Sequence, residues 1–237
     1  MGLVYADMKL CDIILQEPTL IPVINRFGIS LGVGDKNVQT VCKENKLDTN
    51  FFLTILNTFI NKDFFPEKKL KSFCASQIVD YLSKTNDYYE HFQLPNIERH
   101  FHSLLSHSTG KNNLEYIRQF FGELKNDLLK RIDEDRTQWF PAIKKASEQL
   151  TLLQPDVNDF SIDISEQRTD PLEEKLNDLK SLFIIHLSVE CDENLCYGVI
   201  FAIYTLAKDI KQNNRIRHRI LKPLSEALQL ASAKTIR

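Results

Sequence analysis

The amino-acid sequence predicts an all-α protein. Apolar residues recur with the spacing of one helical face, about every 3.6 residues, over long stretches of the chain. Glycine and proline, which interrupt helices, number only seven and eight among the 237 residues. No segment alternates apolar and polar residues with the period of two that is typical of a half-buried β-strand. We therefore expect helices throughout the chain.

The composition is that of an ordinary globular protein and argues against two classes of function. Hydrophobic residues make up 43% of the chain and charged residues 26%, and the formal net charge is −2. Because no run of basic residues forms a stripe, we expect no direct nucleic-acid binding. No apolar run reaches the roughly 18 residues of a membrane span, and Asp7, Lys9 and Asp12 interrupt the place of a signal peptide.

The cysteines favour a reducing compartment. They are odd in number and scattered along the chain, at Cys11, Cys42, Cys74, Cys191 and Cys196. Such a pattern is typical of reduced thiols rather than a disulfide framework. We therefore expect a cytoplasmic protein.

The first seventy residues predict several short helices. The segment 18–26 predicts a brief helix that Gly28 ends, and the segment 29–35 predicts a glycine-containing turn. Asp35 or Asn37 can cap a helix over 38–44, and Asp48 caps the next one. Apolar residues crowd almost every face of that last helix, from Phe51 to Phe59. This density favours burial between other helices, and the alternative is a dimer face over residues 51–65.

Four longer helices follow Pro66, which marks a boundary between residues 1–70 and 71–237. We expect them over 74–107, with a kink at Pro95, over 112–149, from Asp170 to 187, and over 194–231. Asp170 followed by Pro171 is a typical N-cap and first helical position. A polar loop over 152–168 separates the middle pair. Four helices with apolar seams and short to medium connections predict an antiparallel four-helix bundle, preceded by a small helical domain.

Two of the long helices carry polar pairs on the stripe that should be buried. Arg131 and Asp135 lie ten and six residues before Pro141, and Asn213 and Arg217 lie at the same two offsets before Pro223. Residues four apart share one face of a helix. The repeated pattern predicts a polar layer at one depth of the bundle, and therefore a site or the remains of one.

The chain resembles a known family of proteins. The segment 21–48 is similar to the small N-terminal domain of the di-iron proteins that repair iron–sulfur centres, and the bundle resembles the hemerythrin-like domain that follows it there. The resemblance implies two irons held inside the bundle by histidines and carboxylates, with a His-x-x-x-Glu pair on two helices. It also implies paired cysteines at the turn where this chain has Gly32 and Gly34.

Most of the implied ligand positions hold other residues here. The positions are Asn86 (or Asp87 if the register slips by one), His107, Arg131, Asp135, Thr169 (or Asp170), Asn213 and Arg217. Only His107 is a ligand residue at a ligand position. Because a di-iron site needs several facing nitrogen and oxygen ligands, we expect a degenerate site with no metal and no cofactor. The alternative is non-haem iron in a rearranged site, or a weak metal between His107 and Asp135.

Two arrangements of the polar layer are open. In the first, the arginines replace the charge of the metal, and Asp135 pairs with Arg217 in a network with Asn86, Asn213 and Arg131. In the second, the arginine stems extend into solvent and form surface pairs.

The resemblance implies a role linked to iron, oxygen or nitric-oxide stress. We expect a non-catalytic regulatory, sensory or binding protein that acts through a protein partner or as a homodimer. Some bacterial hemerythrin-like chains are fused to a DNA-binding domain, which does not follow within these 237 residues. If the protein regulates transcription, we expect either that it acts through a partner or that the chain is truncated. The alternative is a metal-dependent protein for iron–sulfur cluster repair or for binding oxygen or nitric oxide.

Overall fold

The described part of the chain is helical, as the sequence predicts. The computed structural model describes residues 2–61, 63–66, 75–108, 112–151, 170–187, 192–226 and 228. Within these residues, β pairing is confined to one isolated antiparallel bridge between Lys9 and Asn37. None of the described helices combines the length and the apolar character that a membrane span requires.

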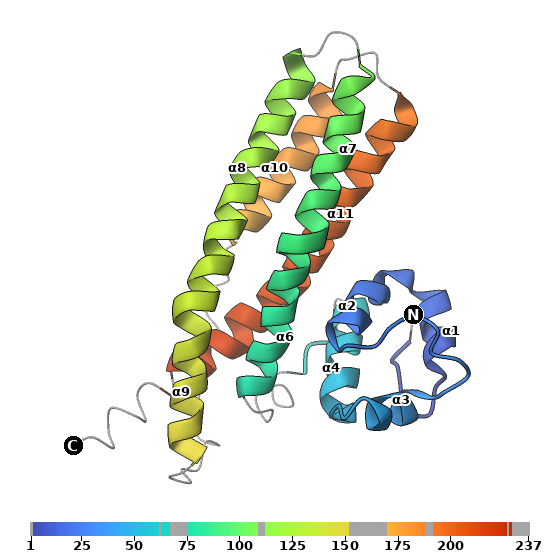
Figure 1. The fold of residues 1–237 in the computed structure, drawn as a ribbon, viewed down its shortest axis with the longest axis vertical. Helices are drawn as coiled ribbons and strands as arrows, with labels where there is room; N and C mark the ends of the chain where they lie inside the picture. The colour runs from blue at the N-terminus through green and yellow to red at the C-terminus, as the bar shows by residue number, and fades with distance from the viewer. Residues whose placement is uncertain are drawn as a thin grey trace, which may run out of the picture. The chain divides into compact units, whose positions relative to one another are not determined.

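The helices follow one another in the order drawn in Figure 1. The first group consists of α1 (Leu10–Gln16), η1 (Pro18–Leu20), α2 (Ile21–Arg26), α3 (Val38–Glu44) and α4 (Thr49–Ile60). The second consists of α6 (Ala75–Tyr88), η2 (Tyr89–Gln93), α7 (Leu94–Ser106), α8 (Asn112–Glu134), η3 (Asp135–Trp139), α9 (Phe140–Thr151), α10 (Pro171–His186), α11 (Glu193–Ile216) and η5 (Arg217–Leu221). The sequence missed α1. The predicted boundary near residue 70 and the loop over 152–168 lie outside the described residues.

Three helices begin at the caps that the sequence indicates. The side chains of Asn37 and Asp48 accept hydrogen bonds from the backbone N–H groups of Thr40 and Phe51, both at 2.8 Å. Asp170 accepts from the backbone N–H of Leu172 at 2.9 Å, with Pro171 at the first helical position. Each bond satisfies one of the donors that a helix N-terminus leaves unpaired.

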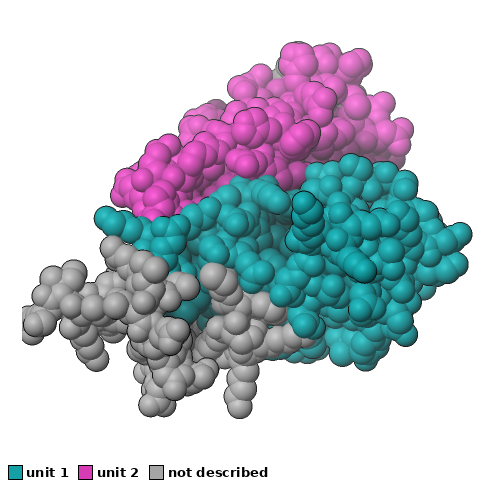
Figure 2. Space-filling model, turned by 60° about the horizontal axis from the view of Figure 1, so that its bottom comes forward, with its two compact units in different colours: residues 1–85, 143–158, 215–237 teal, residues 86–142, 159–214 magenta. Residues whose placement is uncertain are grey.

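The described residues fall into two compact units, which Figure 2 colours separately. Unit 1 takes its residues from 1–85, 143–158 and 215–237, and unit 2 from 86–142 and 159–214.

The core of unit 1 contains the apolar residues of α4. Phe52 and Leu56 have no exposed surface, and Phe51 and Phe59 are 5% and 6% exposed. The burial interpretation of this helix is therefore confirmed, and Phe52 cannot form a dimer face. Before α3, Gly28, Gly32 and Gly34 all have positive φ angles, which glycine adopts without strain, so the predicted turn is present.

A buried asparagine attaches the N-terminal segment to this core. The Asn57 side chain on α4 accepts a hydrogen bond from the backbone N–H of Val4 at 2.7 Å and donates one to its carbonyl at 2.9 Å. Asn57 is 6% exposed and Val4 is 2% exposed. One amide thus satisfies both backbone groups of a buried residue that has no strand partner.

Unit 2 has an apolar core to which α7, α8, α10 and α11 contribute. These helices run side by side in Figure 1, and each gives residues that are at most 1% exposed, for example Phe101, Leu124, Leu179 and Ile203. The ring of Phe101 lies 5.3 Å from that of Phe121 and 6.4 Å from that of Phe183. The 3.6-residue stripes of the sequence therefore point into this core.

The cysteines differ from the expectation of reduced thiols. Cys11 and Cys42 are free, but Cys196, which is 7% exposed at the start of α11, is disulfide-bonded. An odd count of cysteines leaves at least one unpaired, yet it does not prevent others from pairing. The cytoplasmic location remains a prediction.

The Asn57 contacts make a testable prediction about unit 1. Changing Asn57 to Leu leaves the N–H and C=O of Val4 buried without partners, so we expect the free energy of unfolding to fall by about 2–4 kcal/mol. Urea unfolding monitored by circular dichroism measures this. Asn50→Ala, at an exposed position of the same helix, is the matched control. Equal stability of Asn57→Leu and the control would contradict the role of the Asn57 hydrogen bonds in attaching the N-terminal segment.

Candidate functional site

Three π-helical turns precede three prolines. Among the described residues, η2, η3 and η5 each span five residues, and each ends two residues before a proline: Pro95, Pro141 and Pro223. In every turn the backbone N–H just before the proline donates to a carbonyl five residues earlier. Proline lacks its own N–H and its ring clashes with the carbonyl four residues before it, so a widened turn accommodates it. π-Helical turns are rare in proteins as a whole, and those that occur are often found at functional sites.

The polar pairs of the sequence stand at the beginning of these turns. Asp135 and Arg217 are the first residues of η3 and η5, and Arg131 and Asn213 lie four residues before them. The same two offsets before Pro95 give Thr85 and Tyr89, which are each 1% exposed. Sequence reasoning selected Asn86 here and missed Tyr89. The offset from Pro95 was the signal that would have found it.

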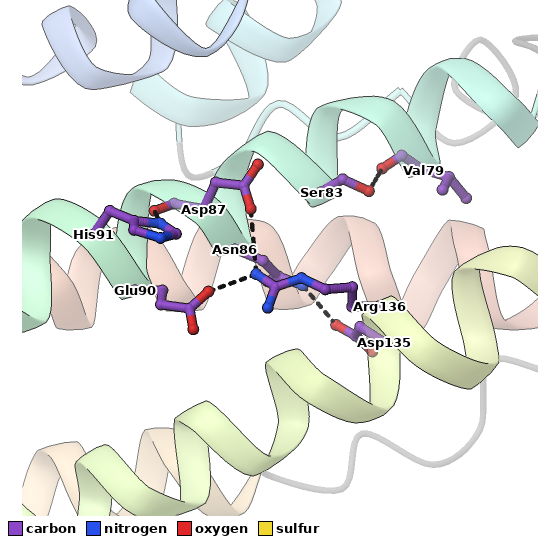
Figure 3. A network of polar contacts seen from close by, with 8 residues as sticks. All are labelled: Val79, Ser83, Asn86, Asp87, Glu90, His91, Asp135 and Arg136. Carbon is purple, nitrogen blue, oxygen red and sulfur yellow. Dashed lines mark hydrogen bonds and ion pairs between the residues drawn. The ribbon is translucent and has the colours of Figure 1, made fainter.

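Asn86 and Asp135 meet inside unit 2. The Nδ2 of Asn86 on α6 donates to Oδ2 of Asp135 at 3.0 Å (Figure 3). Asp135 is 1% exposed, so its carboxylate is taken out of water and depends on such donors. The sequence placed these two residues in one layer, and the structure brings them together.

Arg131 binds a different set of residues from the predicted one. Its Nη1 lies 3.1 Å from Oδ2 of Asp170, and its Nη2 donates to Oδ1 of Asn214 at 2.9 Å. The Nδ2 of Asn214 in turn donates to Oε1 of Glu173 at 2.8 Å. The side chains of Arg131 and Asp170 are 18% and 7% exposed. The planar guanidinium fork thus connects α8 with the N-cap of α10 and with α11.

Asn213 joins a third small network. Its Nδ2 lies 3.0 Å from the hydroxyl of Tyr89, 2.8 Å from Oδ1 of Asp209 and 2.9 Å from the carbonyl of Asp209. All three residues are at most 5% exposed. Among the described residues, Oδ1 of Asn213 has no hydrogen-bond donor. The amide nitrogen, with two protons for three acceptors, is fully used while the oxygen retains both lone pairs.

His107 does not belong to this layer, which removes the metal position between His107 and Asp135. It is exposed at the end of α7, where its Nδ1 lies 2.8 Å from the carbonyl of Ser103. From Asn112, five residues later, the 23 residues of α8 extend about 34 Å towards Asp135. Five residues span at most about 18 Å, so the two side chains cannot bind the same ion.

For two further positions the prediction is neither confirmed nor contradicted. Thr169 lies outside the described residues. Arg217 is half-buried and belongs to unit 1. Its pairing with Asp135 of unit 2 remains a prediction.

A second group of polar residues lies on the surface of unit 2, and the sequence did not single it out. Asp87, Glu90 and His91 each present a ligand atom, and these atoms lie within 4.8 Å of one another. Arg136 of η3 contacts both carboxylates, at 3.3 Å for Asp87 and closer for Glu90 (Figure 3). The hydrogen bond from Arg136 lowers the pKa of the Glu90 carboxyl from its ordinary value. The guanidinium stands where a cation would neutralise the two acids.

The chemistry of the buried layer is that of hydrogen bonding. The side chains of Asn86, Arg131 and Asn213 turn N–H donors toward carboxylate oxygens. N–H groups of arginine and asparagine occupy the lone pairs that a metal ion would need, and arginine has no acceptor atom. The arrangement therefore orients and fixes helices, and it leaves Oδ1 of Asn213 without a donor among the described residues.

Comparison with known proteins finds no match for this chain among protein-family models, curated proteins or solved structures.

The Asn86–Asp135 contact predicts a pH-dependent variant. Changing Asn86 to Asp places two carboxylates at hydrogen-bond distance, and one of them must keep a proton, so its folded-state pKa rises. The folded state then binds more protons than the unfolded state, and stability falls as pH rises from the ordinary carboxyl range. At pH 7 we expect a loss of about 3 kcal/mol, based on a shift of two pKa units.

Urea unfolding at a series of pH values measures this effect. Asn96→Asp on α7 is the matched control, because Asn96 already accepts a hydrogen bond from Arg99 at 3.3 Å. A pH profile for Asn86→Asp that coincides with that of the control would show that Asn86 and Asp135 are not neighbours.

The surface cluster gives a second pH-dependent prediction. Because the folded-state pKa of Glu90 is lowered, its pairing with Arg136 stabilises the fold above the unfolded pKa and is lost as pH falls through the folded pKa. The pair is partly exposed, so we expect Arg136→Met to cost only about 0.5–1 kcal/mol at pH 7. The difference from wild type should disappear in acid. Arg99→Met is the control, and a difference that persists in acid would refute the electrostatic origin.

Proposed function

We propose that this chain is a hemerythrin-like protein in which a network of hydrogen bonds replaces the di-iron site. In this proposal α7, α8, α10 and α11, extended by the neighbouring segments, form an antiparallel four-helix bundle that follows a small helical domain. The protein binds or senses rather than catalyses. Its connection to iron, oxygen or nitric-oxide stress rests on the sequence resemblance alone.

The observation that carries the proposal is the bridge made by Arg131. At a position where the resemblance implies a histidine ligand, a guanidinium contacts Asp170 and Asn214, and Asn214 contacts Glu173. A permanent cation therefore lies beside the carboxylate of Asp170 and is connected through Asn214 to that of Glu173 in a mostly buried layer. This supports a side chain, rather than a metal ion, as the source of positive charge.

The energetics of such a layer favour a structural and signalling role over a large gain in stability. A buried ion pair contributes little net stability, because removal from water costs about as much as the attraction returns. Loss of one partner, however, leaves a buried charge and costs about 3–5 kcal/mol. The layer thus fixes the register of the helices. A partner protein would read the position of those helices, with no direct contact to nucleic acid.

Metal analysis of the purified protein tests the proposal. We expect protein produced in iron-supplemented medium without chelators to contain far less than one iron atom per chain and to show no ligand-to-metal absorption. Elemental analysis and an ultraviolet–visible spectrum measure both. Stoichiometric iron would support the alternative, a rearranged metal site for iron–sulfur cluster repair or for binding oxygen or nitric oxide, and would end the proposal.

A reconstructed site supplies the positive control. The variant restores ligand residues at five positions: Asn86→His, Arg131→His, Asp135→Glu, Asn213→His and Arg217→Glu. If these positions descend from a di-iron site, the variant gains iron and visible absorption that the wild type lacks. His91→Ala identifies any metal bound at the surface cluster, because that change leaves the buried layer intact. A folded reconstructed variant without iron would contradict the hemerythrin-like assignment.

A further inference from the structure

The outer face of α11 carries an exposed stripe with the spacing of a helix–helix seam. Tyr197, Phe201, Tyr204, Lys208 and Lys211 follow one another at intervals of four, three, four and three residues. The aromatic residues are 53%, 67% and 45% exposed, and the two lysines are exposed as well. Intervals of three and four place all five side chains on one face of the helix. The core of unit 2 uses the opposite face.

The stripe has two chemically different halves. Its N-terminal half is aromatic, with Tyr197 and Phe201, and its C-terminal half is cationic, with Lys208 and Lys211. Tyr204 lies at the centre, seven residues from each end. Aromatic ring faces attract ammonium groups. Each half of the stripe therefore complements the other half, but the two halves of one rigid helix cannot meet.

The same chemistry already occurs within the chain at the centre of the stripe. The Nζ of Lys180 on α10 lies 5.2 Å from the centroid of the Tyr204 ring. Burial lowers the pKa of Lys180, and the nearby charge of Lys211 lowers it further. Lysines thus crowd the C-terminal half of the stripe from Tyr204 onwards, and the attraction of an additional aromatic face would offset part of their repulsion.

We propose that the α11 stripe binds the same stripe of a second copy of this chain. The two helices cross antiparallel about a two-fold axis at Tyr204, so that Tyr197 faces Lys211 of the second copy and Phe201 faces Lys208. A two-fold interface uses the same patch on both copies and must be self-complementary, as this stripe is. An acidic partner helix would attract the lysines but would leave the aromatic half without a cation.

The size of the stripe predicts a weak dimer. From Tyr197 to Lys211 the helix rises about 21 Å. One such seam from each copy, flanked by Lys180 of α10, buries less than the roughly 1,600 Å² of a standard stable interface. We therefore expect association that increases with concentration rather than a permanent dimer. This proposal does not depend on whether the chain binds metal.

Two substitutions at one position test both the interface and its register. Phe201→Lys places lysine opposite Lys208 of the second copy, so we expect the dissociation constant to rise at least about tenfold. Phe201→Glu places a carboxylate there instead, and we expect the dimer to persist. Sedimentation equilibrium of the full chain, from low micromolar to several hundred micromolar, measures both. Tyr116→Lys, at a 72% exposed aromatic on α8, is the matched control.

The outcomes separate clearly once circular dichroism has shown the variants to be folded. Dimerisation of wild type, Phe201→Glu and the control, with its loss in Phe201→Lys, supports the proposal. A wild-type protein that stays monomeric throughout the range overturns it. Equal loss in both Phe201 variants overturns the antiparallel register, because a merely apolar patch would not distinguish the two charges. Unchanged dimerisation in Phe201→Lys places any interface elsewhere.

Discussion

The mostly buried guanidinium of Arg131 is the constraint on which the arrangement of unit 2 depends. A charge that is largely removed from water must find acceptors, and here they come from two other helices. Asp170 supplies one, and its second oxygen caps the first turn of α10. Asn214 supplies the other and passes the connection to Glu173. One side chain thus fixes where α10 begins and at which level α11 lies beside α8.

The π turns explain how polar side chains come to stand inside a helical core. An uninterrupted α-helix returns to the same face after three or four residues, and the stripe stays apolar. An inserted residue in a π turn shifts the register, and the proline that follows prevents the helix from closing it again. Asp135 stands at the first residue of such a turn, and Tyr89 stands at the first residue of another. Their polar atoms are then satisfied by side chains, Asn86 and Asn213.

Local signals in the sequence predicted the local structure. They did not predict which residues the long side chains contact. Caps at Asn37, Asp48 and Asp170 act within four residues, and they place three helix starts correctly. The short helix α1 has no capping side chain and was missed. The polar layer was visible because prolines mark it. Which carboxylate Arg131 contacts was not, because its flexible stem reaches several acids and tertiary packing selects among them.

If the layer replaces a metal site, as we propose, the replacement alters what the layer responds to. A metal site couples folding to the supply of the ion, since ligand groups are uncompensated without it. In the observed layer, Asn86 and Arg131 compensate carboxylates with donors that belong to the chain. Under this proposal the helices are held in register without an ion. One buried acceptor of the layer, Oδ1 of Asn213, has no hydrogen-bond donor among the described residues. Through its nitrogen the same amide contacts Tyr89 and Asp209, and it thereby connects α11 with η2.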